Sequence, residues 1–209
     1  MKAHKFRASS LAEIMTDPKA KGEVLSVGAK TAVEKIAKQL VYGYTETFSS
    51  KYTEKGIQVE PVSLALYNSV FFTDYQKNTE RKTNDWITGE CDIFTGDSII
   101  DIKSSWSLAT FPATAAAGID KGYEWQLRAY MMLYDRPQAE LIYCLVTTDS
   151  DLLSSFDDKA LHQVDHIPAD KRITVLKYDR DILLEAEIME RLALCSEYYE
   201  NYMQQLNNK

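Results

Sequence analysis

A short segment in the middle of the chain places two acidic residues and a lysine around a tight turn. The segment reads Asp92-Ile93-Phe94-Thr95-Gly96-Asp97-Ser98-Ile99-Ile100-Asp101-Ile102-Lys103. A two-residue turn at Gly96-Asp97, whose leading glycine suits the type II′ form, pairs the residues on either side of it and sets the register of a β-hairpin. Counting outward puts Ile93 opposite Ile100 and Asp92 opposite Asp101.

Side chains alternate along a strand, so this register divides the hairpin into two faces. The apolar face is expected to hold Ile87, Gly89, Cys91, Ile93, Ile100 and Ile102, and the polar face Thr88, Glu90, Asp92, Asp101 and Lys103. Directly opposed carboxylates repel each other. A hard divalent cation such as Mg²⁺, which takes oxygen ligands, relieves that repulsion. The alternative is a solvated face with an exposed ion pair between Glu90 and Lys103.

A third acidic residue, Glu60, lies in a segment predicted to form a helix from Lys55 that feeds a strand from Val70 to Tyr75. A carboxylate on a buried helical stripe needs a partner. Pro61 suits the first turn of a helix, so the helix starts or bends near Glu60, where free amides offer the carboxylate another partner. The helical stripe consists of Ile57, Glu60, Leu64 and Tyr67.

Gln126 carries an amide on the apolar stripe of a second predicted helix, from Tyr123 to Tyr134. The stripe follows Tyr123, Gln126, Leu127, Tyr130, Met131 and Tyr134. A buried amide without a partner is costly. Gln126 therefore either caps a backbone group of the core or belongs to a polar site.

The predicted elements follow one another as helix, strand, strand, strand, helix and strand. The predicted strands are 70–75, 86–94, 98–104 and 141–147, with the second helix at 123–134. In this order the chain resembles the PD-(D/E)XK nuclease superfamily, and within it the lambda-exonuclease and RecB-like branch used in phage recombination. The motifs that carry the resemblance are Gly56-Ile57-Gln58-Val59-Glu60 with Tyr67, Gly89-Glu90-Cys91-Asp92, Ile99-Ile100-Asp101-Ile102-Lys103-Ser104, and Gln126 with Tyr130. Cys91 departs from the proline of the superfamily name, and Asp101 replaces a glutamate frequent in this branch.

The resemblance implies an α/β (α+β) fold with a restriction-endonuclease-like α-β-β-β-α-β core, in which helices flank a central mixed sheet. We expect N-terminal helices and a long C-terminal helix around that core. One nuclease domain is expected over residues 1–209, because 209 residues with 45% hydrophobic content can bury one core. Its parts are a core at about 55–150, an N-terminal helical region at 1–54, and a C-terminal strand and helix at 170–206.

The implied activity is a Mg²⁺-dependent deoxyribonuclease, for which Mn²⁺ substitutes, that hydrolyses the phosphodiester bonds of linear duplex DNA from a 5′ end. By resemblance the metal ligands are Asp92, Asp101, the Ile102 carbonyl and Glu60, the last directly or through water. Lys103 orients the attacking water or stabilises phosphoryl charge. Gln126 and Tyr130 position the nucleophile or a phosphate. The alternatives are a structure-specific endonuclease on the same core and a catalytically inactive DNA-end-binding protein.

Net charge and cysteine content argue against two classes of DNA-binding protein. The net charge of -7 argues against an open-sided DNA-binding module, since affinity for the phosphate backbone comes largely from lysine and arginine. Three well-separated cysteines cannot form a four-cysteine iron–sulfur site, so buried reduced thiols are expected. No apolar run suits a membrane span, and the residues from Met1 to Arg7 lack the apolar stretch of a signal peptide. We expect a cytoplasmic protein, in the host cell if it is phage-encoded, and no membrane partner.

The resemblance also implies partners: linear duplex DNA ends, a single-strand annealing protein, and a homo-oligomer, which in lambda exonuclease is a ring-shaped trimer. Near the N-terminus, Arg7, Ser9 and Ser10 precede a short helix with Ser10 and Glu13 at capping-box spacing. A helix N-terminus beside an arginine binds anions, so these residues either contact DNA or form an ordinary cap. Trp106, in the loop before Gly122, either stacks on DNA or packs against protein.

If Arg7 binds the terminal phosphate, Arg7→Ala should abolish any preference of the protein for 5′-phosphorylated over 5′-hydroxyl duplex ends. The measurement compares digestion rates of the two substrates for both proteins. An unchanged preference would assign Arg7 to an ordinary helix cap.

Overall fold

The computed structural model describes residues 4–46 and 50–208, so the first residues of the segment used for the signal-peptide expectation lie outside it. The α-helices are α1 (Leu11–Ile14), α2 (Val27–Tyr42), α3 (Lys51–Gln58), α4 (Glu60–Phe71), α5 (Lys121–Tyr134) and α6 (Ile182–Asn207). The strands are β1 (Phe6–Arg7), β2 (Lys82–Thr83), β3 (Ile87–Gly89), β4 (Ile93–Phe94), β5 (Ser98–Ser104), β6 (Gln138–Cys144) and β7 (Ile173–Asp179). Short 3-10 turns occupy Ala8–Ser10, Leu108–Thr110, Ala116–Gly118, Ser150–Leu152, Lys159–Leu161 and Ala169–Lys171.

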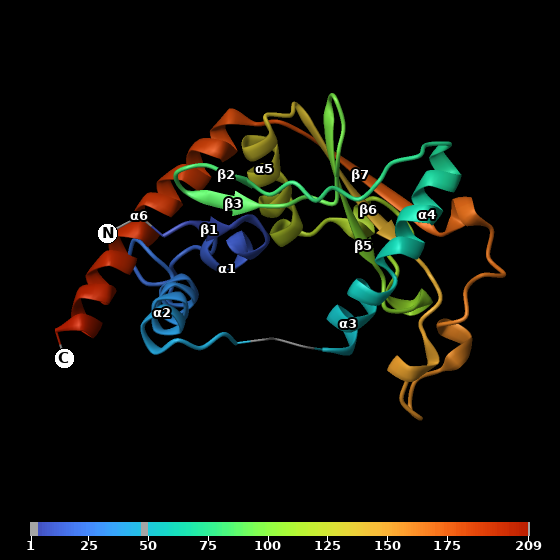
Figure 1. Cartoon of the computed structure of the whole chain (residues 1–209), viewed down its shortest axis with the longest axis horizontal. Helices are drawn as coiled ribbons and strands as arrows, with labels where there is room; N and C mark the ends of the chain where they lie inside the picture. Colours follow the sequence, from blue (N-terminus) through green and yellow to red (C-terminus); the bar gives the residue numbers. More distant parts are fainter. Residues whose placement is uncertain (1–3, 47–49, 209) are drawn as a thin grey trace.

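The central sheet has the strand order β4-β5-β6-β7. Strands β5 and β6 pair in parallel, from Ser98 opposite Gln138 to Ser104 opposite Cys144, whereas β4 and β7 pair antiparallel to their neighbours. The sheet is therefore mixed, as the resemblance implied, and β7 lies at its edge. Figure 1 shows α5 and α6 on one side of this sheet and α4 on the other.

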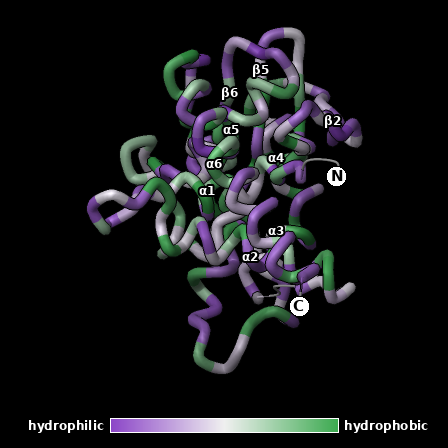
Figure 2. Tube along the Cα trace, turned by 90° about the vertical axis from the view of Figure 1, so that its left-hand side faces the viewer, coloured by the Kyte–Doolittle hydropathy of each residue, from purple (hydrophilic) through white to green (hydrophobic). Residues whose placement is uncertain are grey.

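Alternating side chains of β5 and β6 belong to two separate apolar clusters. Ile99 and Leu141 belong to the larger cluster, which also includes buried residues of α1, α2, α5 and α6. Ile100 and Ile142 belong to a smaller cluster with residues of α4. Figure 2 shows hydrophobic segments of the chain around α1, α5 and α6. Side chains two positions apart in a strand point to the same face. Asp101 therefore lies on the same face as Ile99 and faces α5.

The predicted strand 86–94 is wrong as a single element. It splits into β3 and β4, which belong to different sheets: β3 pairs with β1 and β2 in a small three-stranded sheet, and β4 pairs with β5. The break at residues 90–92 also divides the predicted apolar face, because Ile87 and Cys91 lie in the larger cluster and Ile93 in the smaller one. Ile87, Cys91 and Ile93 are all buried and alternate as they would in a single strand. Their pattern therefore does not show that the chain changes sheets between them.

The predicted strand 70–75 is also wrong, because α4 continues to Phe71. The helix ends where Phe72 adopts a left-handed conformation with φ 55° and its amide donates to the Asn68 carbonyl. The Asn68 side chain then accepts a hydrogen bond from the Tyr75 amide and donates one to the Tyr75 carbonyl, which holds the chain away from a ladder. A short apolar run of this kind does not distinguish helix from strand by its pattern alone.

The hairpin register is confirmed, since Ile93 pairs with Ile100 and the Thr95 amide donates to the Ser98 carbonyl. The type II′ turn is wrong: Gly96 is not among the glycines with positive φ, which that turn requires at its first central residue. The Thr95 hydroxyl instead accepts hydrogen bonds from the amides of Asp97 and Ser98. A side-chain acceptor thus closes the turn.

The flanking helices largely follow their sequence signals. Helix α2 begins after Ser26, whose hydroxyl accepts from the Ala29 amide, and ends at Gly43 with φ 66°. The stripe of α6 is buried at Ile188, Leu192, Cys195 and Tyr199 and continues to Met203. The capping box at Ser10 and Glu13 is wrong, because the Ser10 side chain makes no capping hydrogen bond.

The three cysteines, Cys91, Cys144 and Cys195, are free and buried, as expected. Along residues 4–46 and 50–208, no helix combines the length and apolar character needed to cross a bilayer.

Gly89 lies where the small sheet meets α5. A Cβ atom added there would lie 2.7 Å from Tyr130 Cε1 and 2.9 Å from Ala8 Cβ. Gly89→Ala should therefore destabilise the protein by about 1–3 kcal/mol through overpacking, measured by urea denaturation. Gly96→Ala is the control, because nothing lies within 4 Å of its added Cβ. Equal unfolding midpoints for the two variants would contradict this packing.

Candidate active site

The break between β3 and β4 brings the Asp92 side chain against the neighbouring strand. Asp92 lies beyond the last ladder pair of the hairpin, and its Oδ2 accepts a hydrogen bond from the Ile102 amide at 2.7 Å. Its backbone carbonyl accepts from the Asn78 amide at 2.7 Å. A carboxylate oxygen therefore satisfies the Ile102 amide where the β4 ladder has ended.

Asp101 is buried, with 2% of its surface exposed. Lys103 Nζ lies 2.6 Å from Asp101 Oδ2, and Gln126 Nε2 donates to Asp101 Oδ1 at 3.3 Å. The contact with Lys103 is an ion pair rather than a well-formed hydrogen bond, because Oδ2 has no hydrogen-bond partner among the described residues. A buried carboxylate oxygen that accepts no hydrogen bond remains able to bind a further cation.

Helix α5 supplies the polar groups that face Asp101. Gln126 is buried and its Nε2 also donates to the Tyr130 hydroxyl at 3.0 Å. Lys103 Nζ lies 4.8 Å from the centre of the Tyr123 ring. Positions 123, 126 and 130 share one helical face, so a single helix presents the Gln126 amide to Asp101, the Tyr130 hydroxyl to that amide and the Tyr123 ring to Lys103. Gln126 thus contacts the candidate site rather than capping a core backbone group.

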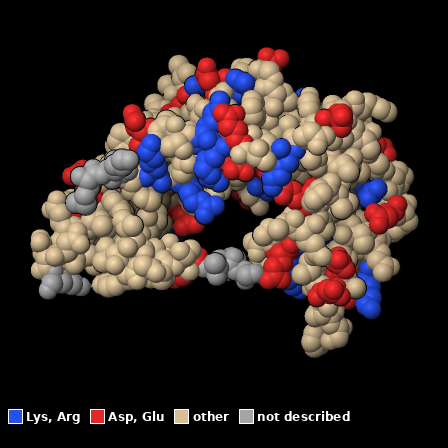
Figure 3. Space-filling model, viewed as in Figure 1, with Lys and Arg blue, Asp and Glu red and all other residues tan. Residues whose placement is uncertain are grey.

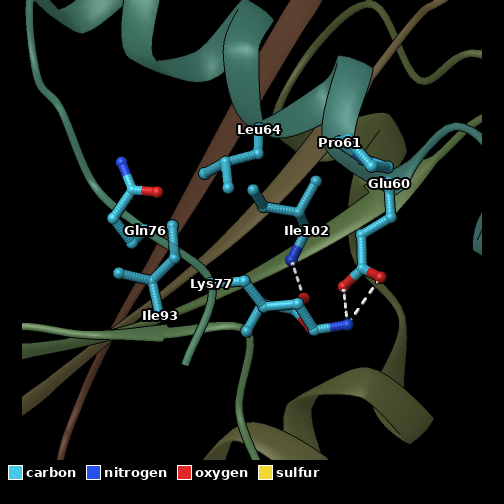
Figure 4. Close-up of a pocket in the computed structure, with 8 residues that line it drawn as sticks. Glu60, Pro61, Leu64, Gln76, Lys77, Ile93 and Ile102 are labelled. Carbon is cyan, nitrogen blue, oxygen red and sulfur yellow. Dashed lines mark hydrogen bonds and ion pairs between the residues drawn. The ribbon is translucent and has the colours of Figure 1, made fainter. Parts of the chain in front are cut away.

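Glu60 is the first residue of α4, with Pro61 in the first turn, so the helix starts near Glu60. Its carboxylate pairs with Lys77, with distances from Nζ of 2.5 Å to Oε1 and 2.6 Å to Oε2. Figure 4 shows Lys77 reaching Glu60 across a small pocket that Asp92 also lines. The expected buried stripe is wrong at Ile57, which is 76% exposed and lies on α3.

Together, burial and the crowded charges raise the pKa values of three groups of the site, Asp92, Lys103 and Tyr130. Burial, followed by the Asp101 charge, raises the pKa of Asp92 from 3.8 to about 7. Burial alone lowers the pKa of Lys103, but the Asp101 and Asp92 carboxylates outweigh it, so the pKa of Lys103 lies above its ordinary value. Burial and the Asp101 charge raise the pKa of Tyr130. The site therefore carries an excess of negative charge, which a bound cation lowers.

These groups line an open cleft of about 630 Å³. The lining residues are Tyr52, Thr53, Gly56, Ile57, Glu60, Asp92, Asp101, Ile102, Lys103, Ser104, Tyr123, Gln126 and Tyr130. The structure thus brings together all six residues predicted to be catalytic, together with Ile102. Figure 3 shows this face of the molecule hollowed beside α3, with lysine, arginine and acidic side chains around the hollow.

The residues predicted to bind DNA do not line this cleft. Arg7, the last residue of β1, is exposed. In the 3-10 turn between β1 and α1, Ser9 is exposed and Ser10 is half-buried. Trp106 packs between protein groups, with its ring 5.2 Å from that of Tyr52 and 5.0 Å from that of His162.

Sequence reasoning missed two side chains that contact the site. Tyr123 was placed on the α5 stripe but not in the site, although an aromatic residue one helical turn before Gln126 was a usable signal. The second is Lys77, to which no sequence pattern gave a role in the site. Its contact with Glu60 joins residues 17 positions apart, across a segment whose structure the pattern did not predict.

Comparison with solved structures finds close likeness over nearly the whole chain. A phage-related exonuclease from Haemophilus somnus 129PT is 34% identical, with a TM-score of 0.91 over 98% of this chain and 97% of that chain. The alkaline exonuclease LHK-Exo from Laribacter hongkongensis is 18% identical, with a TM-score of 0.70 over 99% of this chain and 93% of that chain. The complex of LHK-Exo with dAMP gives 21% identity and a TM-score of 0.71 over 98% and 92% of the two chains. No protein-family model and no curated protein matches the chain.

The fold and the acidic cleft define a nuclease-fold protein of the PD-(D/E)XK superfamily. At 34% identity over 98% of its length, the chain belongs to the family of phage-related exonucleases.

Without a bound cation, the raised pKa of Asp92 should make the protein less stable as the pH rises. Between pH 3.8 and about 7 the folded state holds a proton that the unfolded chain releases, so raising the pH favours unfolding. Asp92→Asn should remove this dependence and stabilise the protein at pH 8 in chelator by up to about 4 kcal/mol. Thermal unfolding from pH 4 to pH 8 measures it, with the exposed turn residue as control in Asp97→Asn. A lower midpoint for Asp92→Asn than for the control at pH 8 would contradict the assignment.

Proposed function

We propose that this protein is a Mg²⁺-dependent DNA exonuclease that digests one strand of linear duplex DNA from a 5′ end, with Mn²⁺ as a substitute metal. The observation that carries the proposal is the buried Asp101 carboxylate, whose Oδ2 accepts no hydrogen bond while Lys103 and Asp92 lie beside it. Such an arrangement concentrates negative charge at one point of an open cleft. That point suits a divalent cation, which in turn would bind a phosphate.

The donor set fits magnesium. Mg²⁺ is usually held by one or two carboxylates and keeps several of its waters. Asp92, Asp101 and the Ile102 carbonyl would hold it, and Glu60 would act through water. Among the described residues no three His, Cys, Asp or Glu side chains lie close enough together to hold a metal ion. When bound, the ion lowers the pKa of a water and polarises the scissile phosphate.

The remaining roles belong to side chains of the chain itself. Lys103 keeps its charge beside two carboxylates, so its ammonium can donate to a phosphoryl oxygen or orient the attacking water. Gln126 donates to Asp101 Oδ1, while Asp101 Oδ2 is paired with Lys103 and would be shared with a cation. Its second contact, with the Tyr130 hydroxyl, fixes that hydroxyl near the same edge of the cleft.

The relatives support DNA as the substrate. The Haemophilus somnus protein is described as a phage-related exonuclease, and LHK-Exo is found in complex with dAMP, a deoxynucleotide. We infer that this chain likewise acts on DNA ends in phage-type recombination in the cytoplasm of a host cell. A single-strand annealing protein and a ring-shaped homotrimer are the partners that this role suggests.

Asp101→Asn and Lys103→Met should each reduce Mg²⁺-dependent degradation of linear duplex DNA by at least about 100-fold, because each removes a charged side chain that would lie beside the reacting phosphate. The test follows release of separate 5′ and 3′ end labels with Mg²⁺ and with chelator. Lys177→Met is the matched control, since Lys177 is an exposed lysine that pairs with Glu140 on the far edge of the sheet.

Covalently closed circular DNA separates the exonuclease from an endonuclease, because an end-dependent enzyme leaves it intact. Wild-type rates in either site variant would refute the proposed site. Release of the 3′ label first would refute the proposed polarity.

A further inference from the structure

A buried lysine lies outside the charged site, on the helix that forms one wall of the cleft. Lys55 of α3 is 1% exposed. Its Nζ donates to three backbone carbonyls: Ser105 at 2.6 Å, Trp106 at 2.9 Å and Val146 at 2.9 Å. An ammonium group has three N–H donors. Every donor of Lys55 is therefore used, and among the described residues it forms no ion pair with a carboxylate.

The three carbonyls come from the segments that leave the parallel strands β5 and β6. Ser105 and Trp106 follow β5, and Val146 follows β6; the Ser105 amide donates to the Cys144 carbonyl, so the two exits lie side by side. Burial lowers the pKa of Lys55 to about 8, which still leaves it protonated at pH 7. The charge is retained in the interior because three carbonyl dipoles surround it.

Helix α3 has little else to hold it in place. Lys55 is its one buried residue, while Tyr52 and Ile57 are 58% and 76% exposed. Its other contacts include two polar pairs nearer the surface, Lys51 with Asp157 and Gln58 with Asp149. The half-buried Trp106 ring also contacts α3, 5.2 Å from the Tyr52 ring and 4.6 Å from Lys51 Nζ. Helices this short are marginal in water without tertiary contacts. Apolar burial, which positions α4, α5 and α6, therefore does not position α3.

Helix α3 also faces the cleft. Tyr52, Thr53, Gly56 and Ile57 line it across from Lys103 and Tyr123. We propose that Lys55 is a positioning residue, whose three hydrogen bonds hold the α3 wall at a fixed distance from the end of β5 that carries Lys103. This inference rests on the proposed nuclease function, because the expected effect of Lys55 is to keep the width of the DNA-binding cleft constant. Lys103 itself is held by the β5–β6 ladder, so Lys55 governs how DNA fits rather than the chemistry of the carboxylates.

Lys55→Met, which keeps the length of the side chain and removes its donors, should raise the KM for linear duplex DNA about 10-fold while changing kcat by less than about 3-fold. Leu192→Ala is the matched control: it removes a buried side chain of α6, away from the cleft, and lowers stability without releasing α3. Its KM should equal that of the wild type. An unchanged KM in Lys55→Met, or the same rise in Leu192→Ala, would overturn the inference.

Hydrogen exchange provides a readout that does not depend on nuclease activity. The helical amides of α3 should exchange at least about 10-fold faster in Lys55→Met than in the wild type, whereas those of α6 stay the same. Equal exchange of the α3 amides in the two proteins would overturn the positioning role of Lys55 even if the wild type degrades DNA. A wild type without nuclease activity would refute the proposed function, but hydrogen exchange would still test the role of Lys55. If Lys55→Met does not fold, Lys55→Gln, which keeps two N–H donors, replaces it. The KM for duplex DNA and the exchange rate of the α3 amides should then rise by less, and no rise in either would overturn the inference.

Discussion

The structure around the cleft depends on one constraint, the placement of two carboxylates and an ammonium group where apolar clusters cover both faces of the sheet. Asp101 is buried because it shares a strand face with Ile99, which packs under α5. Charge in such a place must be paired or coordinated. Lys103 provides a counter-charge from the same strand, Gln126 provides a hydrogen bond from α5, and one carboxylate oxygen is still left without a hydrogen bond. This carboxylate oxygen is the one on which the proposed metal site rests.

The break between β3 and β4 is the backbone counterpart of that constraint. If the hairpin ladder continued past Ile93, Asp92 would stand directly across from Asp101, with like charges opposed. The chain instead leaves the ladder, and the Asp92 carboxylate accepts the Ile102 amide. The same departure allows β3 to join a second sheet, which carries Gly89 into contact with Tyr130. Electrostatic relief and sheet topology therefore have a common origin at residues 90–92.

Two ways of supporting the cleft are combined in this fold. Helices α4 and α5 are held by apolar clusters on either face of the sheet, and they deliver Glu60 and Gln126 by ordinary helical periodicity. Helix α3 is held mainly through polar contacts, with Lys55 at their centre. A wall fastened by directional hydrogen bonds has a defined position without needing an apolar face, which leaves its exposed Tyr52 and Ile57 available to the cleft.

The amino-acid sequence by itself determined the hairpin register, the helical face of Gln126 and Tyr130, and the set of acidic residues, because a turn and the periods of 2 and 3.6 are local properties. It did not determine where the 86–94 segment changes sheets or that residues 70–71 remain helical, since short apolar runs suit either element. Only the tertiary structure decided that Lys77 pairs with Glu60 and that Lys55 is buried among carbonyls. Both contacts join segments whose approach is set by packing, and a lysine in isolation is expected at the surface.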